Sequence, residues 1–309
     1  MRFRQVTDWL VSAAARMVIC AVQTCSLESL DRMCWLVAKV LADWIPVRRR
    51  TIDENLHLLL GEKPTREYAK MRRLMWHHLL LMICEIAIAP RKIHRWNWRD
   101  FFYFRDKNSA FRILVDSRPT ILVTGHFGNF ELAGYVTGLF GFPSTTIARQ
   151  LDNPYLHKYL SEFRSLGGQH LLDKGRAAGA VQELLDRGGT VAMLADQHAG
   201  DKGCWVDFLG RQASCHKGLA LLALTSKAPM VVCYCRRQGR PLQFEMGVTG
   251  IADPNTVESQ LESVQGLTTW YNRRLEEAIY MAPSQYWWLH RRWRDRPKSK
   301  KNVVDSAPQ

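Results

Sequence analysis

The pattern that most constrains the fold of this chain begins after Pro119. From there, short runs rich in β-branched and other apolar residues alternate with stretches of helical periodicity. The strand-like runs lie at residues 120–124, 144–148, 190–195, 229–235 and 242–248. The helical stretches lie at residues 130–140, 153–167, 174–187, 216–227 and 256–282. Alternation of this kind predicts an α/β fold with a mainly parallel or mixed central sheet covered by helices.

The residues before this alternation have a different pattern, which predicts helices only. Apolar residues recur at helical spacing over residues 9–24, 27–44, 48–60 and 65–89. No linker rich in glycine, serine or proline separates the two patterns, so we expect both to pack as one unit. We expect a membrane-associating part at residues 1–47, a main domain at 48–297 that is helical to residue 107, and a polar, disordered tail at 298–309.

The charge of the chain narrows the classes of partner. There are 43 Lys and Arg against 29 Asp and Glu, a formal net charge of +14. A surplus of this size predicts anionic partners, such as nucleic acid, phospholipid headgroups or an acidic carrier. The sequence has no RNA-binding signature, zinc-finger spacing or glycine-rich phosphate loop. We therefore expect a membrane surface or an anionic substrate, and no nucleic acid.

The first two helical stretches favour membrane attachment. The run from Trp9 to Val22 is apolar but is interrupted by Arg16, and it is shorter than the roughly 20 apolar residues that span a bilayer. The next stretch, "CWLVAKVLADWIP", is apolar on one side and carries Lys39 between tryptophans. Two amphipathic segments of this kind predict helices that lie in the membrane interface. The alternative is a pair of ordinary core helices.

The eight cysteines do not form the framework of a small secreted protein. A reducing compartment is the simpler interpretation. Cys204, Cys215 and His216 offer metal-ligating atoms, but no CxxC pair supports a zinc site, so no metal is expected. Cys204 and Cys215 remain formal candidates for a nucleophile.

The stretch "LVTGHFGNFELAGY" is the main candidate for a reactive site. A strand-like run ends at Thr124, Gly125 and Gly128 permit a tight turn, and a helix follows. In open α/β sheets, sites lie where strands end and loops lead into helices. His126 lies at this junction, and Glu131 lies in the first helical turn. We expect the Glu131 carboxylate to contact one imidazole nitrogen and leave the other nitrogen as a general base.

Other strand ends are expected to meet the same edge. Arg149 follows the next strand, and Asn153 is the expected cap of a helix that carries Arg164. Asp196 and Gln197 end a third strand. Near the carboxyl terminus, "QYWWLHRRWRDRP" combines arginines, which clamp phosphate, with tryptophans, which suit a lipid interface.

These stretches together resemble the bacterial lipid A late acyltransferases. The resemblance rests on "GHFGNFE", "ARQLDNPYL", "LADQ", "VDFLGRQA" and "YWWLHRRWRDRP", in the family's order, and covers roughly residues 48–297. It implies a glycerolipid-acyltransferase-like fold and an enzyme on the cytoplasmic face of the inner membrane. Such an enzyme moves a fatty acyl group from acyl carrier protein, or coenzyme A, to a hydroxyl of an anionic glycolipid, with no other cofactor.

The resemblance also assigns roles to residues. His126 and Glu131 match the family's His-x4-acid catalytic dyad. The other positions that match residues around the family's site are expected to bind substrate: Arg149, Asn153, Arg164, Asp196, Gln197, Trp288, His290 and Arg291. Arg149 or a backbone N–H of the Gly128 turn is the expected oxyanion donor.

Two rival functions remain at this point. The acceptor could be another lipid, such as a phosphatidyl-polyol or an aminolipid. The chain could also be a non-catalytic membrane- or lipid-binding protein, although such a protein needs no base with an orienting acid. The absence of a GxSxG elbow argues against a serine hydrolase.

Overall fold

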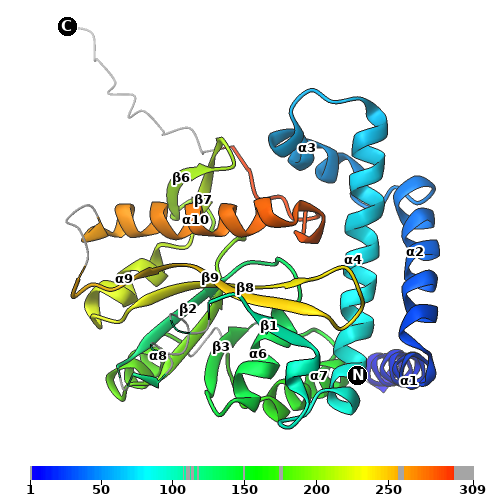
Figure 1. The fold of residues 1–309 in the computed structure, drawn as a ribbon, viewed down its shortest axis with the longest axis horizontal. Coiled ribbons are helices and arrows are strands. Elements are labelled where there is room, and N and C mark those ends of the chain that lie inside the picture. The colour runs from blue at the N-terminus through cyan, green and yellow to red at the C-terminus, as the bar shows by residue number, and fades with distance from the viewer. Residues whose placement is uncertain are drawn as a thin grey trace, which may run out of the picture.

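The alternating runs form a seven-stranded mixed sheet at the centre of the molecule (Figure 1). The computed structural model describes residues 2–106, 108, 112, 115–116, 118–148, 150–173, 177–256 and 261–295. The strand order is β1-β9-β8-β2-β5-β3-β4, and every neighbouring pair is parallel except β8 with β9. The strands are β1 Phe102–Phe104, β2 Thr120–Thr124, β3 Ser144–Ala148, β4 Gln169–Asp173, β5 Thr190–Leu194, β8 Met230–Arg237 and β9 Phe244–Ala252.

Helices cover both faces of this sheet, as two buried clusters of apolar side chains require. One cluster packs α8, α9, α10 and a separate hairpin, β6–β7, against the sheet. The other packs α6 and α7 against the opposite face, together with the end of α4. The elements are α6 Phe130–Leu139, α7 Pro154–Leu166, α8 Ala177–Asp186, β6 Cys204–Phe208, β7 Arg211–Cys215, α9 Lys217–Thr225 and α10 Val264–Met281.

The first hundred residues form a helical layer against one end of the sheet. This layer consists of α1 Arg2–Thr24, α2 Leu27–Asp43, α3 Arg49–Leu60 and α4 Thr65–Lys92. In Figure 1, α2 and α4 lie side by side, and α1 lies at the foot of this pair. The long helix α4 lies between α2 and the rest of the protein, because its inner side chains join both apolar clusters. The amino-terminal helices therefore lie within reach of the loops that follow the strands.

The predicted fold class is confirmed, and the structure adds elements that the sequence pattern missed. The short strands β1, β4, β6 and β7 were not predicted. Strand β1 lies in a segment expected to be helical, and β4, "QHLLD", has only two consecutive apolar residues. The predicted tail at 298–309 lies outside the described residues.

Candidate active site

The loop that carries His126 connects β2 to α6. Strand β2 is buried on both sides by its neighbours β5 and β8, and it ends at Thr124. The helix α6 begins at Phe130, where the Asn129 side chain caps it by accepting a hydrogen bond from the Leu132 N–H at 3.2 Å. His126 is thus fixed between a central strand and a capped helix, at the carboxyl edge of the parallel strands.

Asp196 is the acid that contacts His126. Its Oδ1 lies 2.8 Å from the imidazole Nδ1, and its Oδ2 accepts a hydrogen bond from the His126 backbone N–H, also at 2.8 Å. Strands β2 and β5 are parallel neighbours with Thr124 opposite Leu194, so the residues that follow them meet. The Asp196 side chain is buried, with an exposed fraction of 3%. Two hydrogen bonds to one buried carboxylate fix the imidazole ring.

The charge states of this pair follow from its surroundings. Burial by itself raises the pKa of Asp196, but the His126 ring, its hydrogen bonds and the Arg292 guanidinium outweigh burial and lower that pKa to about 2. Burial by itself lowers the pKa of His126, but the Asp196 carboxylate, with a contribution from Glu131, raises that pKa above its ordinary value. Because Nδ1 faces a carboxylate, the neutral imidazole keeps its proton there and Nε2 is free to accept one.

Three side chains lie beside the imidazole on its other sides. The Gln197 amide nitrogen is 3.3 Å from His126 Nε2, so it donates to this nitrogen. The Trp287 ring packs 4.9 Å from the imidazole, and Phe130 packs 5.1 Å from it. Trp287 was not predicted from sequence. Its position becomes visible only because the Phe127 and Tyr286 segments pair side by side, with the Trp287 N–H donating to the His126 carbonyl.

The expected contact between Glu131 and His126 is wrong. Glu131 instead forms a two-point ion pair with Arg164 of α7, with the Arg164 Nε 2.9 Å from Oε2. The physical reason is direction. Glu131 lies inside the first turn of α6 and extends away from the loop, whereas Asp196 lies on a neighbouring strand end beside it. Glu131 influences the imidazole only through its charge.

Gly125 and Gly128 have the conformational roles expected of a tight turn. A Cβ on Gly125 would lie 3.3 Å from the Asp196 carboxylate, so glycine lets that carboxylate approach. Gly128 has a φ of +60°, and a Cβ there would lie 1.9 Å from the Cys235 carbonyl oxygen. Of the backbone N–H groups in this turn, that of Gly128 is not free to stabilise an oxyanion, because it donates to the Gln285 carbonyl at 2.9 Å.

In the carboxyl-terminal segment, Trp287 and Arg292 lie at the site in place of their neighbours Trp288 and Arg291, which were the predicted residues. Trp288 has no exposed surface, and its indole N–H donates to the Pro283 carbonyl, so it is a core residue and Trp287 is its neighbour in the site. Arg291 is exposed, whereas Arg292 is 1% exposed and donates to the Gln197 carbonyl at 2.6 Å. Arg292 therefore supports the turn that carries Asp196 and Gln197. Neither Trp288 nor Arg291 contacts the imidazole.

The remaining predicted residues lie at different distances from this centre. The Nε2 of His290 accepts the His198 N–H at 3.1 Å, and burial lowers the pKa of His290 to about 4, so this ring is neutral near pH 7. Asn153 caps α7 as expected, but its amide donates to the Asp8 carbonyl of α1 and not to the site. Arg149 lies outside the described residues.

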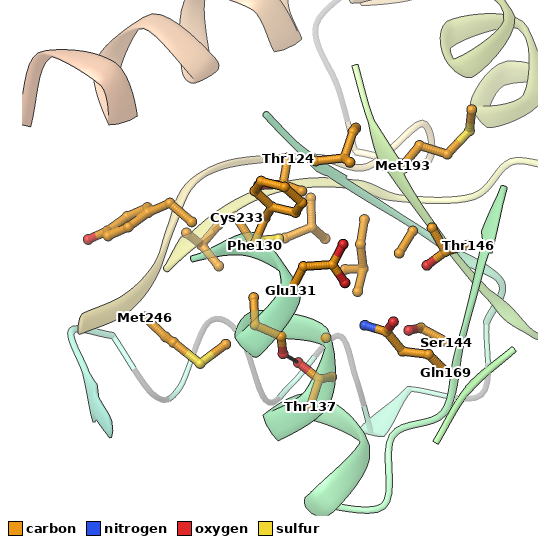
Figure 2. A pocket seen from close by; sticks show the side chains of 18 of the residues that line it. Thr124, Phe130, Glu131, Thr137, Ser144, Thr146, Gln169, Met193, Cys233 and Met246 are labelled. Carbon is orange, nitrogen blue, oxygen red and sulfur yellow. Dashed lines mark hydrogen bonds between the residues drawn. The ribbon is translucent and has the colours of Figure 1, made fainter. Parts of the chain in front are cut away.

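A largely apolar cavity lies on the face of the sheet that α6 covers, and Phe130, which packs against the imidazole, is part of its lining. Figure 2 shows Glu131 extending into it from α6, with Thr124, Phe130 and Cys233 nearby. Its volume is about 120 Å³. Leu122, Ala192 and Thr146 line it from three neighbouring strands, at positions that face one another across the sheet. The Glu131–Arg164 pair supplies the charged groups of this mainly apolar wall, and Gln169 and several hydroxyl side chains add neutral polar groups.

Cys204 and Cys215 are poor nucleophiles in this structure. They face each other across the β6–β7 hairpin, and burial raises the pKa of both thiols. A thiol with a raised pKa is mostly protonated near neutral pH and therefore reacts slowly. The imidazole of His126, held by Asp196, is therefore a better candidate for the reactive group than either thiol.

The fold and the site define an α/β enzyme that combines a buried His–Asp pair with an apolar cavity, and comparison with known proteins gives the family. The bacterial lipid A biosynthesis acyltransferase family matches residues 1–295. The chain belongs to this family and is an acyltransferase.

Individual relatives are distant in sequence. The chain is 26% identical over 269 residues to the lipid A biosynthesis lauroyltransferase of Escherichia coli, covering 85% of this chain and 84% of the relative. It is 24% identical over 275 residues to the E. coli palmitoleoyltransferase, with 86% of each covered. A phosphatidylinositol mannoside acyltransferase of Mycolicibacterium smegmatis matches 43% of this chain and 45% of its own length at 27% identity. The Thermotoga maritima 1-acyl-sn-glycerophosphate acyltransferase PlsC aligns over 84% of this chain and 98% of its own, with 12% identity and a TM-score of 0.39.

Proposed function

We propose that the protein transfers a fatty acyl group from an acyl carrier protein thioester, or a coenzyme A thioester, to a hydroxyl of a lipid A precursor or a similar phosphorylated glycolipid. The observation that carries this proposal is the His126–Asp196 pair together with an apolar cavity, joined through Phe130, which packs against the imidazole and lines the cavity. A base beside an apolar cavity suits a reaction in which one substrate is a fatty acyl chain and the other supplies a hydroxyl proton.

The proposed reaction follows from the tautomer of His126. Its Nε2 accepts the hydroxyl proton while the hydroxyl oxygen attacks the thioester carbonyl, and Asp196 stabilises the imidazolium that forms. The tetrahedral intermediate then expels the thiolate, which takes the proton from Nε2, so an ester and a free thiol are released. No covalent acyl-enzyme is needed.

Gln197 is our proposed oxyanion donor. Its amide occupies the hydrogen-bonding position at Nε2 that the acceptor hydroxyl would take. When the hydroxyl binds there, the amide has to turn away, and the carbonyl of the thioester lies next to it. An amide N–H directed at developing negative charge lowers the barrier in such sites.

The basic charge and the apolar helices support the proposed partners. A surplus of 14 positive charges favours both the acidic surface of a carrier protein and a phosphorylated lipid. Members of this family are membrane-associated, and we propose that the chain binds the cytoplasmic face of the inner membrane. Two helices, Arg4–Thr24 and Thr65–Lys92, are long and apolar enough to cross a bilayer, but half of the second is buried within the protein. We propose that α1 lies in the interface, where Arg16 can reach water.

A transfer assay in mixed micelles tests the function. Purified wild type and His126→Ala receive labelled acyl carrier protein and a phosphorylated glucosamine disaccharide lipid. We expect product with wild type only, with a rate at least about 100-fold lower in the variant. Equal rates for the two proteins would exclude His126 as the base.

A second arm tests the other acceptor. The match to a phosphatidylinositol mannoside acyltransferase supports a different glycolipid. If wild type transfers nothing to the disaccharide lipid, total membrane lipid is supplied instead. Product in that arm would keep the proposed chemistry and change the acceptor, and absence of product with either thioester would leave a lipid-binding role.

A further inference from the structure

A buried cluster of charged and polar side chains lies beneath the His126 loop. Glu85 of α4 is 1% exposed, and Arg237 at the end of β8 is 9% exposed. The Arg237 guanidinium donates two hydrogen bonds to this carboxylate, from Nε to Oε1 at 2.7 Å and from Nη2 to Oε2 at 2.6 Å. The Glu85 carboxylate also accepts the Leu242 N–H at 3.0 Å and the Asn129 amide at 3.1 Å. Asn129 is the residue that caps α6, so the cluster reaches the loop directly.

His78 forms the second link, and its partners fix its tautomer. Its Nδ1 lies 2.8 Å from Arg237 Nη1, which can only donate, so Nδ1 accepts. The ring proton is therefore on Nε2, which lies 3.2 Å from the Gly128 carbonyl oxygen and donates to it. Burial and the Arg237 charge hold the pKa of His78 well below its ordinary value, in agreement with a neutral ring. Arg237, His78 and Gly128 thus form one directed chain of hydrogen bonds.

These contacts fix the peptide group between Gly128 and Asn129 from both sides. Its carbonyl accepts from His78, and its N–H donates to the Cys235 carbonyl at 2.8 Å. The preceding Gly128 N–H donates to Gln285. The backbone from His126 to Asn129 therefore has little freedom, and the imidazole is held against Asp196 by the position of its own backbone.

Stability alone does not account for such a cluster. Replacing a buried ion pair by well-packed apolar residues is often neutral or stabilising, because burying charges is costly. Every polar atom of Glu85 and His78 already has a protein partner, so no ligand is required to complete the cluster. What the cluster provides is a defined orientation of one turn, and a catalytic turn is where orientation matters most.

We propose that His78, Glu85 and Arg237 are positioning residues for acyl transfer. Through Gly128 and Asn129 they hold the His126 loop so that Nδ1 stays in contact with Asp196 and Nε2 faces the substrates. The inference rests on the proposed role of His126 as the base.

The test compares two amides at position 78. In His78→Gln, the carboxamide can reach both partners, accepting from Arg237 and donating to the Gly128 carbonyl. In His78→Asn, the shorter side chain keeps the Arg237 contact but cannot reach Gly128. We expect His78→Gln to retain kcat within about threefold, and His78→Asn to lose about tenfold or more in kcat with KM nearly unchanged. His77→Asn is the matched control, because the neighbouring His77 contacts Asp31 of α2 at 2.9 Å.

The pH profile separates positioning from loss of folded protein. If the loop moves, the contact between His126 and Asp196 weakens, the pKa of His126 falls, and the acidic limb of kcat/KM moves to lower pH. Loss of folded protein would instead lower the rate equally at all pH values.

If His78→Asn does not fold, Asn129→Ser takes its place in the same kcat and pH measurements, because serine keeps the helix cap and removes the donor to Glu85. Equal kcat and equal pH profiles for the Asn and Gln variants would overturn the inference. Absence of transfer by wild type would instead count against the proposed function.

Discussion

At the scale of single residues, two carboxylates lie near the imidazole of His126 and only one contacts it. Asp196 holds Nδ1 at 2.8 Å, whereas Glu131 pairs with Arg164. An orienting acid acts by fixing the tautomer and by stabilising the imidazolium of the transition state. The two carboxylates therefore contribute differently to the pKa of His126 and to catalysis. Replacing each carboxylate by its isosteric amide separates the two contributions.

Asp196→Asn tests the contribution of the acid in contact. We expect kcat to fall about 10²–10⁴-fold, because the imidazolium loses its counter-charge. The Asp196 carboxylate raises the pKa of His126, so its removal lowers that pKa. Only the neutral imidazole can accept a proton, so the acidic limb of the pH–rate profile should move to lower pH. Steady-state rates from pH 5 to 9 measure both effects.

Glu131→Gln is the matched comparison for that prediction. Its charge is the smaller of the two carboxylate contributions that raise the pKa of His126. We expect a smaller displacement of the acidic limb than in Asp196→Asn. A larger displacement of the acidic limb in Glu131→Gln than in Asp196→Asn would show that Glu131 is the orienting acid.

At the scale of elements, the turn between β2 and α6 depends on one glycine. Gly128→Ala would need a positive φ and would place a Cβ 1.9 Å from the Cys235 carbonyl oxygen, a backbone atom of β8. The left-handed conformation alone costs a non-glycine residue about 1–2 kcal/mol, and the clash forces the turn to move. We expect Gly128→Ala to lose most of its activity, measured as kcat per folded protein.

Gly141→Ala is the control for the turn. Gly141 also has a positive φ, +87°, but a Cβ there meets no atom within 4 Å. It should lower the melting temperature slightly and leave kcat unchanged. Similar kcat values for the two alanine variants would mean that the position of the Gly128 turn does not limit the reaction.

The strands β2, β3 and β5 form part of the wall of the cavity, so their side chains should influence which acyl chain is accepted. Ala192 lies opposite Leu122 and Thr146 on that wall. In Ala192→Met, a longer side chain fills part of the cavity, and a mismatch of one methylene is worth about 10–200-fold in such discrimination. We expect kcat/KM for long acyl donors to fall at least about tenfold relative to shorter ones. A series of acyl carrier protein thioesters of increasing length measures this ratio.

Val191→Ile gives the control for the cavity. Val191 is fully buried in the core on the other side of the same strand and does not line the cavity. It adds a methylene without narrowing the cavity, so the ratio between long and short donors should stay at the wild-type value. An unchanged ratio in Ala192→Met would place the acyl chain elsewhere.

The strand ends were predictable from sequence, and the contacts between them were not. The pattern placed His126, Asp196 and Gln197 at carboxyl ends of strands, which is where the structure has them. Which acid contacts the imidazole depends on the register between β2 and β5, and no local pattern encodes that register. The same limit explains Trp287 and Arg292. A short segment without regular secondary structure has no periodicity that would reveal which side chains face inward.

At the scale of the whole molecule, α2 has apolar side chains on two faces. Its inner face packs against α4 through Leu30, Cys34, Ala38 and Ala42, which recur at every fourth position. Its outer face exposes a second apolar stripe: Met33, Leu36, Val37 and Val40. The helix α1 also exposes large apolar side chains, those of Trp9, Leu10, Met17 and Val18. Exposed apolar surface of this extent marks an interaction site, and the basic charge of the chain favours an anionic membrane as the partner.

Leu36→Glu tests this surface. Leu36 is 62% exposed, so the substitution leaves the packing of α2 on α4 intact and places a charge on the outer face. A buried methylene contributes about 0.8 kcal/mol to binding at an apolar interface, and glutamate in addition repels anionic lipid. We expect at least about tenfold weaker sedimentation with vesicles that contain phosphatidylglycerol.

Leu221→Glu is the control, because Leu221 is 52% exposed on α9, at the opposite end of the molecule from α2 (Figure 1). Transfer to a short-chain, water-soluble acceptor should be equal in both variants, since neither residue touches the site. If Leu221→Glu weakened vesicle binding as much as Leu36→Glu, net charge rather than the α1–α2 surface would determine attachment.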